Sequence, residues 1–371
     1  SSSARILQAL GAAAMIPASV ALVLQTFSKE KMPIAVAIWG ALGAISGAAG
    51  PSLGGLVVET LGWRWAFFIN LPVGIFSLLL GLRVLPEGRE VVRGRLPDPL
   101  GALLLAGGLA VVSYGIVQTE SWGWLSVGLL VCTLGGLALI AAFFWRCAKV
   151  PNPMLDLRLF ESPNFRWANT AMFVYAIAFS ASFLGNVLFL TGIWHFSILQ
   201  AGVGVAPGPL IVAILAPQTG RLAAKYGQRP LLLIGGLVRG SGGLWFFINA
   251  TATPQHSSIY LPAIALTGCG VALCLPQLSS AALKDLPPDQ LGAGSAVGQA
   301  IRNLGTTLGV AAAIALIAHQ VSVTSFHHIW IMLMTSGVLV SLLAIRLPRQ
   351  AKPLILPVEP AISATGPSGD R

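Results

Sequence analysis

The amino-acid sequence predicts an all-α, polytopic membrane helical bundle, and three observations lead to this fold class. Of the 371 residues, 55% are hydrophobic and only 9% are charged, whereas about a quarter of the residues in a soluble domain are charged. Apolar runs of about twenty residues, long enough to cross a hydrocarbon core of about 30 Å, recur along most of the chain. These runs are continuous and do not alternate in ten-residue segments, which disfavours a β-barrel.

Eleven membrane-spanning helices are predicted, each an apolar run that ends at a short polar segment. In order, they cover residues 4–27, 33–58, 65–84, 98–118, 124–146, 166–191, 201–222, 230–250, 258–281, 291–318 and 328–346. The segments that separate them read SKEKM, ETLGWR, LPEGREVVRGRLP, TESWG, CAKVPNPMLDLRLFESPNF, GIWHFSILQ, AAKYGQR, TATPQHS, ALKDLPPDQ and HQVSVTSFH. The closing residues, 347–371, are rich in Pro, Ser, Gly and Ala, which predicts a disordered tail.

The distribution of Lys and Arg over the loops supports this count and predicts the orientation. When every second loop is assigned to one side, starting with the loop after the first span, the loops of that side, the span ends next to them and the tail together hold 18 of the 22 Lys and Arg residues. The opposite loops hold only Arg64, and Arg5, Arg239 and Arg302 fall inside spans. Because cytoplasmic loops carry the excess of Lys and Arg, we expect the C-terminus in the cytoplasm and residue 1 on the outer face. This dispersal accounts for the net charge of +10, so no nucleic-acid partner is expected.

The most specific motif lies in residues 46–74, SGAAGPSLGGLVVETLGWRWAFFINLPVG. Small residues and a proline recur in its first half, namely Ser46, Gly50, Pro51, Gly54 and Gly55. This pattern resembles the antiporter motif G-x-x-x-G-P-x-x-G-G of the major facilitator superfamily, with Ser46 in place of the first glycine. The second half is similar to the W-R-W…F…I-N-x-P-x-G run of that family's fourteen-span drug:proton antiporter branch. The resemblance implies a tight contact between two helical bundles at a central gate, and the alternative is close packing without motion.

Three further segments are similar to the same family. RILQALGAA resembles its fourth-helix motif through Arg5, Gln8 and Gly11, with Ala9 where glycine is usual. PNPMLDLRLF, residues 151–160, resembles the segment after two inserted helices. GRLAAKYGQRP resembles a cytoplasmic loop motif through Gly220, Leu222, Lys225, Gly227 and Arg229, with Ala224 in place of the family's Asp. That replacement puts a charge-relay role of this loop in doubt.

The resemblance implies a division of the chain into four parts. Residues 1–86 would be a remnant of an N-terminal bundle, helices four to six, and residues 87–150 a linker with two inserted membrane helices. Residues 151–346 would form a C-terminal six-helix bundle, and residues 347–371 the cytoplasmic tail. On this interpretation three helices precede residue 1 in the full family member, which agrees with the orientation inferred from charge.

Charged groups inside spans are expected to carry coupling or to line the pathway. None of the acidic residues lies deep in a predicted span, and the resemblance places the coupling acid in the missing first helix, near Arg5. The alternative for Arg5 is a cation at the membrane interface. Arg302 shares a helix face with Gln299 and Asn303, and this stripe is either part of the pathway or a structural hydrogen-bond network. The role of Arg239, snorkelling or helix packing, stays open.

Substrate contacts are inferred from the family's architecture, in which the first, fourth, seventh and tenth core helices line the cavity. The polar and aromatic residues of the corresponding spans include Gln8, Met15, Tyr175, Phe179, Asn186 and Gln277. For Phe179 the alternative is a lipid-facing or helix-packing aromatic. A cavity rich in aromatic residues and poor in acids suits bulky apolar or anionic compounds better than small cations.

The sequence therefore predicts a secondary active transporter that exports amphipathic drugs or metabolites by proton-coupled alternating access. Two alternatives are a transport-inactive membrane fragment or helix-packing partner, and a dedicated exporter of one metabolite. An enzyme is disfavoured because no acid or His–acid pair lies deep in a span, and no cofactor or metal site is expected. The expected partners are a small amphipathic substrate, protons and the lipid bilayer of a bacterial plasma (inner) membrane, with a monomer among the states left open.

Overall fold

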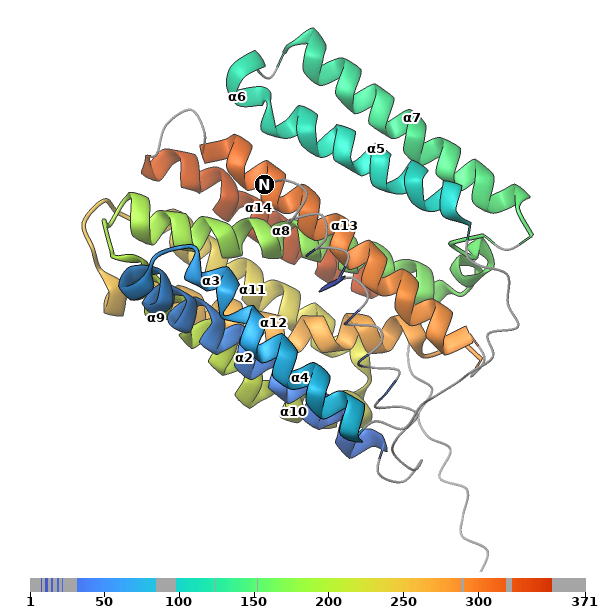
Figure 1. Ribbon diagram of the computed structural model, residues 1–371, viewed down its shortest axis with the longest axis horizontal. Coiled ribbons are helices and arrows are strands. Elements are labelled where there is room, and N and C mark those ends of the chain that lie inside the picture. Colours follow the sequence, from blue (N-terminus) through green and yellow to red (C-terminus); the bar gives the residue numbers. More distant parts are fainter. Residues whose placement is uncertain are drawn as a thin grey trace, which may run out of the picture.

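The computed structural model describes residues 32–84, 98–123, 125–151, 153–287, 290–317 and 322–348, together with Gln8, Gly11, Ala12, Met15, Ser19 and Leu22. Every regular element in the ranges just given is a helix (Figure 1). The predicted first span, 4–27, lies outside the described residues apart from those six positions. The predicted tail beyond Pro348 also lies outside them.

The helices follow the predicted spans closely. They are α2 (Met32–Leu61), α3 (Trp65–Phe68), α4 (Asn70–Val84), α5 (Pro99–Val117), α6 (Thr119–Trp122), α7 (Val127–Lys149), η1 (Leu157–Glu161), α8 (Pro163–Gly192), α9 (Ile198–Val205), α10 (Pro207–Tyr226), α11 (Gln228–Asn249), η2 (His256–Tyr260), α12 (Leu261–Leu283), α13 (Leu291–Ile317) and α14 (Val323–Ile345). In the described part of the chain, nine helical segments are long and apolar enough to cross a membrane. They coincide with the predicted third to eleventh spans, and α2 occupies the predicted second span.

The helix boundaries have local causes in the sequence. Serine side chains cap α7, α8 and α14 by accepting a backbone N–H from the first turn, which satisfies a donor that has no partner within the helix. At α9, Ser197 and Gln200 form a reciprocal capping box. Gly227 separates α10 from α11 with a φ of 83°, a conformation that favours glycine.

The predicted span 201–222 differs from the structure in one respect. It is divided into α9 and α10, with Ala206 between them and Pro207 at the start of α10. Pro207 has no backbone N–H to donate, so the helical hydrogen-bond series is interrupted at this point, although Ala206 itself keeps helical φ and ψ angles of −58° and −33°. The apolar run continues across the break, which is why hydropathy alone joins the two helices.

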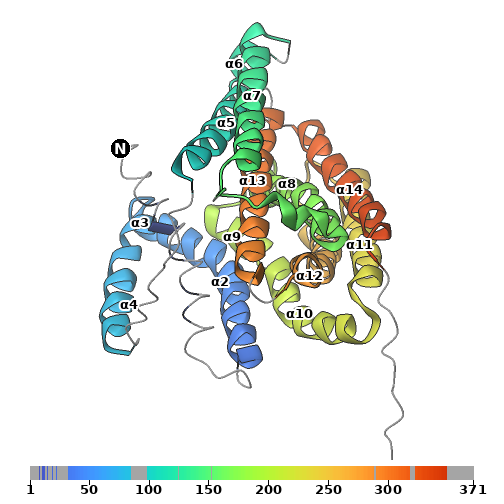
Figure 2. The ribbon, with the colours of Figure 1, turned by 90° about the vertical axis from the view of Figure 1, so that its right-hand side faces the viewer.

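The helices from α8 onward form one bundle. α11 packs against α12 and α14, α8 packs against α12, α13 and α14, and α10 packs against α12 (Figure 2). Glycines bring backbones together at several of these contacts. At the α11–α14 contact, for example, a Cβ atom built on Gly236 or on Gly337 would clash with the facing glycine's carbonyl oxygen. Lipid gives no hydrophobic drive for helices to associate, so this close contact is a main source of their attraction.

Two helical units lie against this bundle. The antiparallel pair α5 and α7 forms a hairpin at its side, with α5 next to α13 (Figure 1). On another side, α2 packs against α9 and α10. These contacts place the predicted inserted helices beside α13 and the glycine–proline segment of α2 against α9.

Candidate functional site

The interior of the bundle holds a buried arginine near the middle of α11. Arg239 is 1% exposed, and its guanidinium carbon lies 4.2 Å from the centre of the Tyr175 ring on α8. Its Nη1 donates a hydrogen bond of 3.3 Å to Ser336 Oγ on α14. Its Nη2 has no hydrogen-bond partner among the described residues. A cation in this position is a candidate functional group, because charge inside a membrane protein is costly.

The backbone of α12 explains why this arginine is covered so completely. A Cβ atom on Gly270 would lie 2.8 Å from both the Cα and the backbone nitrogen of Arg239. Only glycine at this position lets the two helices approach so closely. Sequence reasoning noted Arg239 as an intramembrane charge and left its role open, because the contacts with Tyr175 and Ser336 join helices far apart in the chain.

Aromatic rings continue from Tyr175 along one face of α8. Tyr175 and Phe179 stack with centres 5.9 Å apart and planes 14° apart, and Phe179 and Phe183 stack at 6.3 Å and 21°. The four-residue spacing puts all three on one helix face. Tyr175 is buried and Phe183 is 41% exposed, so the series leads from the bundle interior to its surface.

The predicted polar stripe of α13 lies beside this aromatic series. Gln299 and Arg302 line a cavity of about 70 Å³ between α8, α12 and α13. Gln299 Nε2 donates to Asn303 Oδ1 at 3.1 Å, and Asn303 is exposed. Met172 of α8 also lines this cavity, and Tyr175 follows it by three residues on the same helix. The polar stripe of α13 and the aromatic series of α8 therefore lie near the same cavity.

The remaining predicted cavity residues differ in their burial. Gln277 is 2% exposed inside the bundle, whereas Asn186 is half-buried on α8. Met15 and Gln8 are exposed, and Arg5 lies outside the described residues. The roles of these residues in substrate binding or coupling stay predictions.

The glycine–proline segment of α2 makes a backbone contact with α9. A Cβ atom on Gly55 would lie 2.9 Å from the carbonyl oxygen of Ile198, and one on Gly202 would clash with the carbonyl of Pro51. Ser52 Oγ donates to the Gly202 carbonyl oxygen at 3.2 Å. The other motif residues do not share in this contact: Gly50 and Gly54 have open space where a Cβ would stand, and Ser46 is exposed.

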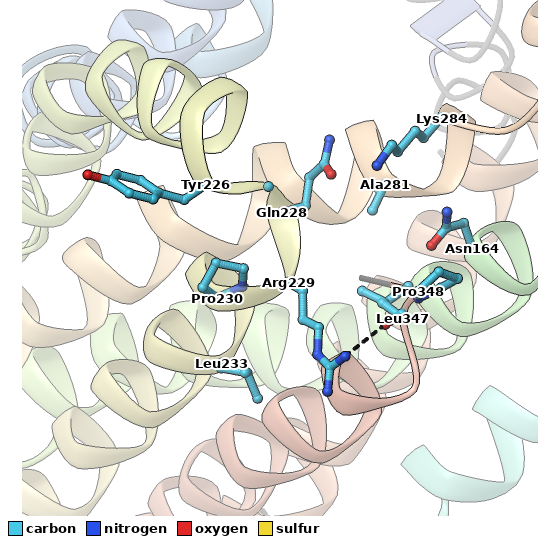
Figure 3. A pocket seen from close by; sticks show the side chains of 11 residues that line it. Asn164, Tyr226, Gln228, Arg229, Pro230, Leu233, Ala281, Lys284, Leu347 and Pro348 are labelled. Atoms are coloured by element: carbon cyan, nitrogen blue, oxygen red, sulfur yellow. Dashed lines mark hydrogen bonds between the residues drawn. The ribbon is translucent and has the colours of Figure 1, made fainter. Parts of the chain in front are cut away.

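The predicted loop motif contributes to a second, larger cavity of about 380 Å³ at the end of the bundle where α10 meets α11 (Figure 3). Gly227 and Arg229 line it, and Arg229 Nη1 donates to the Leu347 carbonyl oxygen at 3.5 Å. Lys284 points toward the same space from α12 (Figure 3). The other motif residues, Gly220, Leu222 and Lys225, are exposed.

Several curated bacterial resistance proteins are similar to this chain in sequence. Multidrug resistance protein Stp of Mycobacterium tuberculosis is 32% identical over 328 residues, which cover 88% of this chain and 60% of that protein. The tetracenomycin C resistance and export protein of Streptomyces glaucescens is 27% identical over 319 residues, which cover 85% of this chain and 59% of that protein. The lincomycin resistance protein LmrB of Listeria monocytogenes is 26% identical, with coverages of 85% and 66%. The chain thus spans about 60% of the length of the first two relatives.

A solved structure shares the fold. The crystal structure of an auto-inhibited POT family peptide transporter matches 89% of this chain and 72% of its own, with a TM-score of 0.54 and 17% sequence identity. The family model of the Major Facilitator Superfamily matches residues 3–184 and 168–367. Because these matches cover nearly the whole sequence, the chain belongs to the major facilitator superfamily.

Proposed function

We propose that this integral membrane transporter exports amphipathic small molecules, driven by a proton gradient, by alternating access. On this proposal it lies in a bacterial plasma membrane with its C-terminus in the cytoplasm. The observation that carries the proposal is the backbone contact between α2 and α9, because α2 belongs to the predicted first bundle and α9 to the second.

This contact has the properties that a reversible gate requires. The backbones approach closely at Gly55 and Gly202, and Ser52 supplies a side-chain hydrogen bond across the contact. Such a bond contributes a net stabilisation of only about 1 kcal/mol. Such a contact can close when the two bundles rock together and can open again for a small free energy, as alternating access requires.

The direction of transport and its energy source have separate support. The names of two relatives describe multidrug resistance and the resistance to and export of tetracenomycin C, which supports outward transport. Proton coupling rests on the resemblance of the Ser46–Gly55 segment to an antiporter motif. None of the 12 acidic residues of the chain lies deep in a predicted span, so the proton drive is tested separately, with a protonophore.

Dye accumulation in bacterial cells that lack their own efflux pumps tests the proposal. Cells that express the protein are expected to accumulate less of a lipophilic fluorescent dye than cells with empty vector, and a protonophore is expected to abolish the difference. Gly202→Leu should also abolish it, because the added side chain would collide with the Pro51 backbone. Gly135→Leu is the matched control, since Gly135 is exposed on α7 with open space at its Cβ position.

Two results would count against the proposal. If membrane-inserted protein leaves accumulation unchanged, the transport-inactive alternative is favoured. If export persists with the protonophore present, the carrier stands but its drive is not the proton gradient.

A further inference from the structure

The charge inside the C-terminal bundle points to the class of compound that the protein carries, an inference that rests on the proposed function. We propose that the substrate is an amphipathic anion. Its negative group binds Arg302 in the cavity between α8, α12 and α13, and its apolar body lies along Tyr175, Phe179 and Phe183.

The first step is the balance of charge. Arg239 and Arg302 lie within α11 and α13, and Arg302 is about 16 Å along α13 from Leu291 at 1.5 Å per residue. None of the chain's Asp and Glu residues falls in helices α8 to α14. Arginine does not lose its proton in proteins. The middle of the described bundle therefore holds two positive charges, on Arg239 and Arg302, that no acid of its own helices balances, and an anion entering it would be attracted.

The second step is the chemistry of the cavity. Arg302, Gln299 and Ser295 line it from α13, and further polar side chains come from the two facing helices, namely Asn169 and Ser279. A guanidinium, amides and hydroxyls can all donate hydrogen bonds to an anionic oxygen. The volume of about 70 Å³ suits a carboxylate or a similar small group but not a whole drug-sized molecule. This arrangement is typical of a site for the head of an amphiphile.

The third step is the aromatic surface beside that cavity. Tyr175 follows Met172, which lines the cavity, by three residues on α8, and it begins the stacked series that ends at Phe183, which is 41% exposed. Arg239 packs against the Tyr175 ring and so fixes the start of the series. Flat apolar rings can stack on such a surface. A compound with an anionic head and an aromatic body matches both parts.

Two dyes with the same ring system and opposite charge provide a direct test. Fluorescein is an anionic xanthene and rhodamine 6G a cationic one. Their binding to the purified full chain in phosphatidylcholine nanodiscs is measured by fluorescence anisotropy. We expect fluorescein to bind more tightly than rhodamine 6G, and Arg302→Gln to weaken fluorescein binding about tenfold, as for the loss of a charge-assisted hydrogen-bonded pair. Arg302→Lys keeps the charge but loses the two-pronged donor. Its affinity for fluorescein should therefore lie between that of the unaltered protein and that of Arg302→Gln.

Two further variants serve as a control and as a second test of the binding site. Arg158→Gln removes the same charge from an exposed position in η1 and should leave fluorescein binding unchanged. Phe183→Ala, at an exposed aromatic position, should weaken binding without touching the arginines. A melting temperature measured for each variant separates loss of binding from loss of folding.

The outcomes also separate this inference from the proposed function. If rhodamine 6G binds and fluorescein does not, the anionic class is wrong while the carrier stands. If fluorescein binds Arg302→Gln as tightly as the unaltered protein, the assignment of the head site is wrong. If neither dye binds and expressing cells export neither, both proposals fail.

Discussion

At the scale of single residues, the contact between Arg239 and Tyr175 defines the bundle interior. The ring supplies an attractive surface to a cation that is 1% exposed, and Ser336 accepts one of its hydrogen bonds. The Tyr175 hydroxyl itself is buried with no hydrogen-bond partner among the described residues. The aromatic ring and the hydroxyl of the same side chain therefore have opposite effects on stability.

Two substitutions of Tyr175 separate these effects. Tyr175→Phe keeps the ring and removes a buried hydroxyl without a hydrogen-bond partner, so it should leave the melting temperature unchanged or raise it. Tyr175→Leu removes the ring that faces Arg239 and should cost about 2 kcal/mol or more of stability. Melting of the purified protein in detergent measures both. If Tyr175→Phe destabilises the protein as much as Tyr175→Leu does, the hydroxyl makes a stabilising hydrogen bond and the prediction is wrong.

At the scale of elements, the α5–α7 hairpin is closed by an ion pair at one end. Asp98 precedes α5 and is 7% exposed. It accepts hydrogen bonds from Arg146 Nε at 2.5 Å and Nη2 at 3.0 Å, and also from the backbone N–H of Leu100 at 3.2 Å. Along the hairpin, Gly108 and Gly136 let the two backbones touch. One side chain thus starts α5 and joins it to the end of α7.

The ion pair predicts a pH dependence. The hydrogen bond from Arg146 holds the pKa of Asp98 below its ordinary value of 3.8. A carboxylate with a lowered pKa in the folded state stabilises that state above its ordinary pKa, and the effect is lost as the pH falls through the lowered value. Asp98→Asn should therefore melt at a lower temperature than the unaltered protein at pH 7, and the difference should shrink only below about pH 3.8.

The comparison of melting curves needs one control. Asp156→Asn alters an exposed carboxylate that accepts a hydrogen bond from the backbone N–H of Arg158. At pH 7 it should therefore lower the melting temperature less than Asp98→Asn does. A difference for Asp98→Asn that is unchanged down to pH 2 would contradict the role of the ionised carboxylate.

The elements were predictable from the sequence to a greater extent than the site. Helix bounds followed from apolar runs, because a bilayer fixes the length that a span needs. The break at Pro207 was missed because the apolar run continues through it. The predicted cavity residues Tyr175 and Gln277 lie inside the bundle, and the contact of Tyr175 with Arg239 joins helices far apart in the sequence. Hydropathy predicts that a helix crosses the membrane, but it does not predict which face of that helix packs against which neighbouring helix.

At the scale of the whole molecule, the charge distribution and the fold together predict how the protein sits in the membrane. α10 and α11 meet at Gly227, close to Lys225 and Arg229, whereas the loop after α11 has no Lys or Arg from residue 250 to 257. Because Lys and Arg favour the cytoplasmic side, the Gly227 end should face the cytoplasm. Three further spans, α12, α13 and α14, then bring Leu347 back to that side, where it accepts the hydrogen bond from Arg229.

Two matched cysteine variants test this orientation. Cys132, Cys147, Cys269 and Cys274 are first replaced by alanine. Ala224→Cys and Ala252→Cys then place a single thiol at exposed positions on either side of α11, the first in the last turn of α10 and the second in the loop after α11. A membrane-impermeant maleimide should label only Ala252→Cys in intact cells and both variants after permeabilisation. Labelling of Ala224→Cys alone would invert the orientation, and labelling of both in intact cells would mean that α11 does not span the membrane between them.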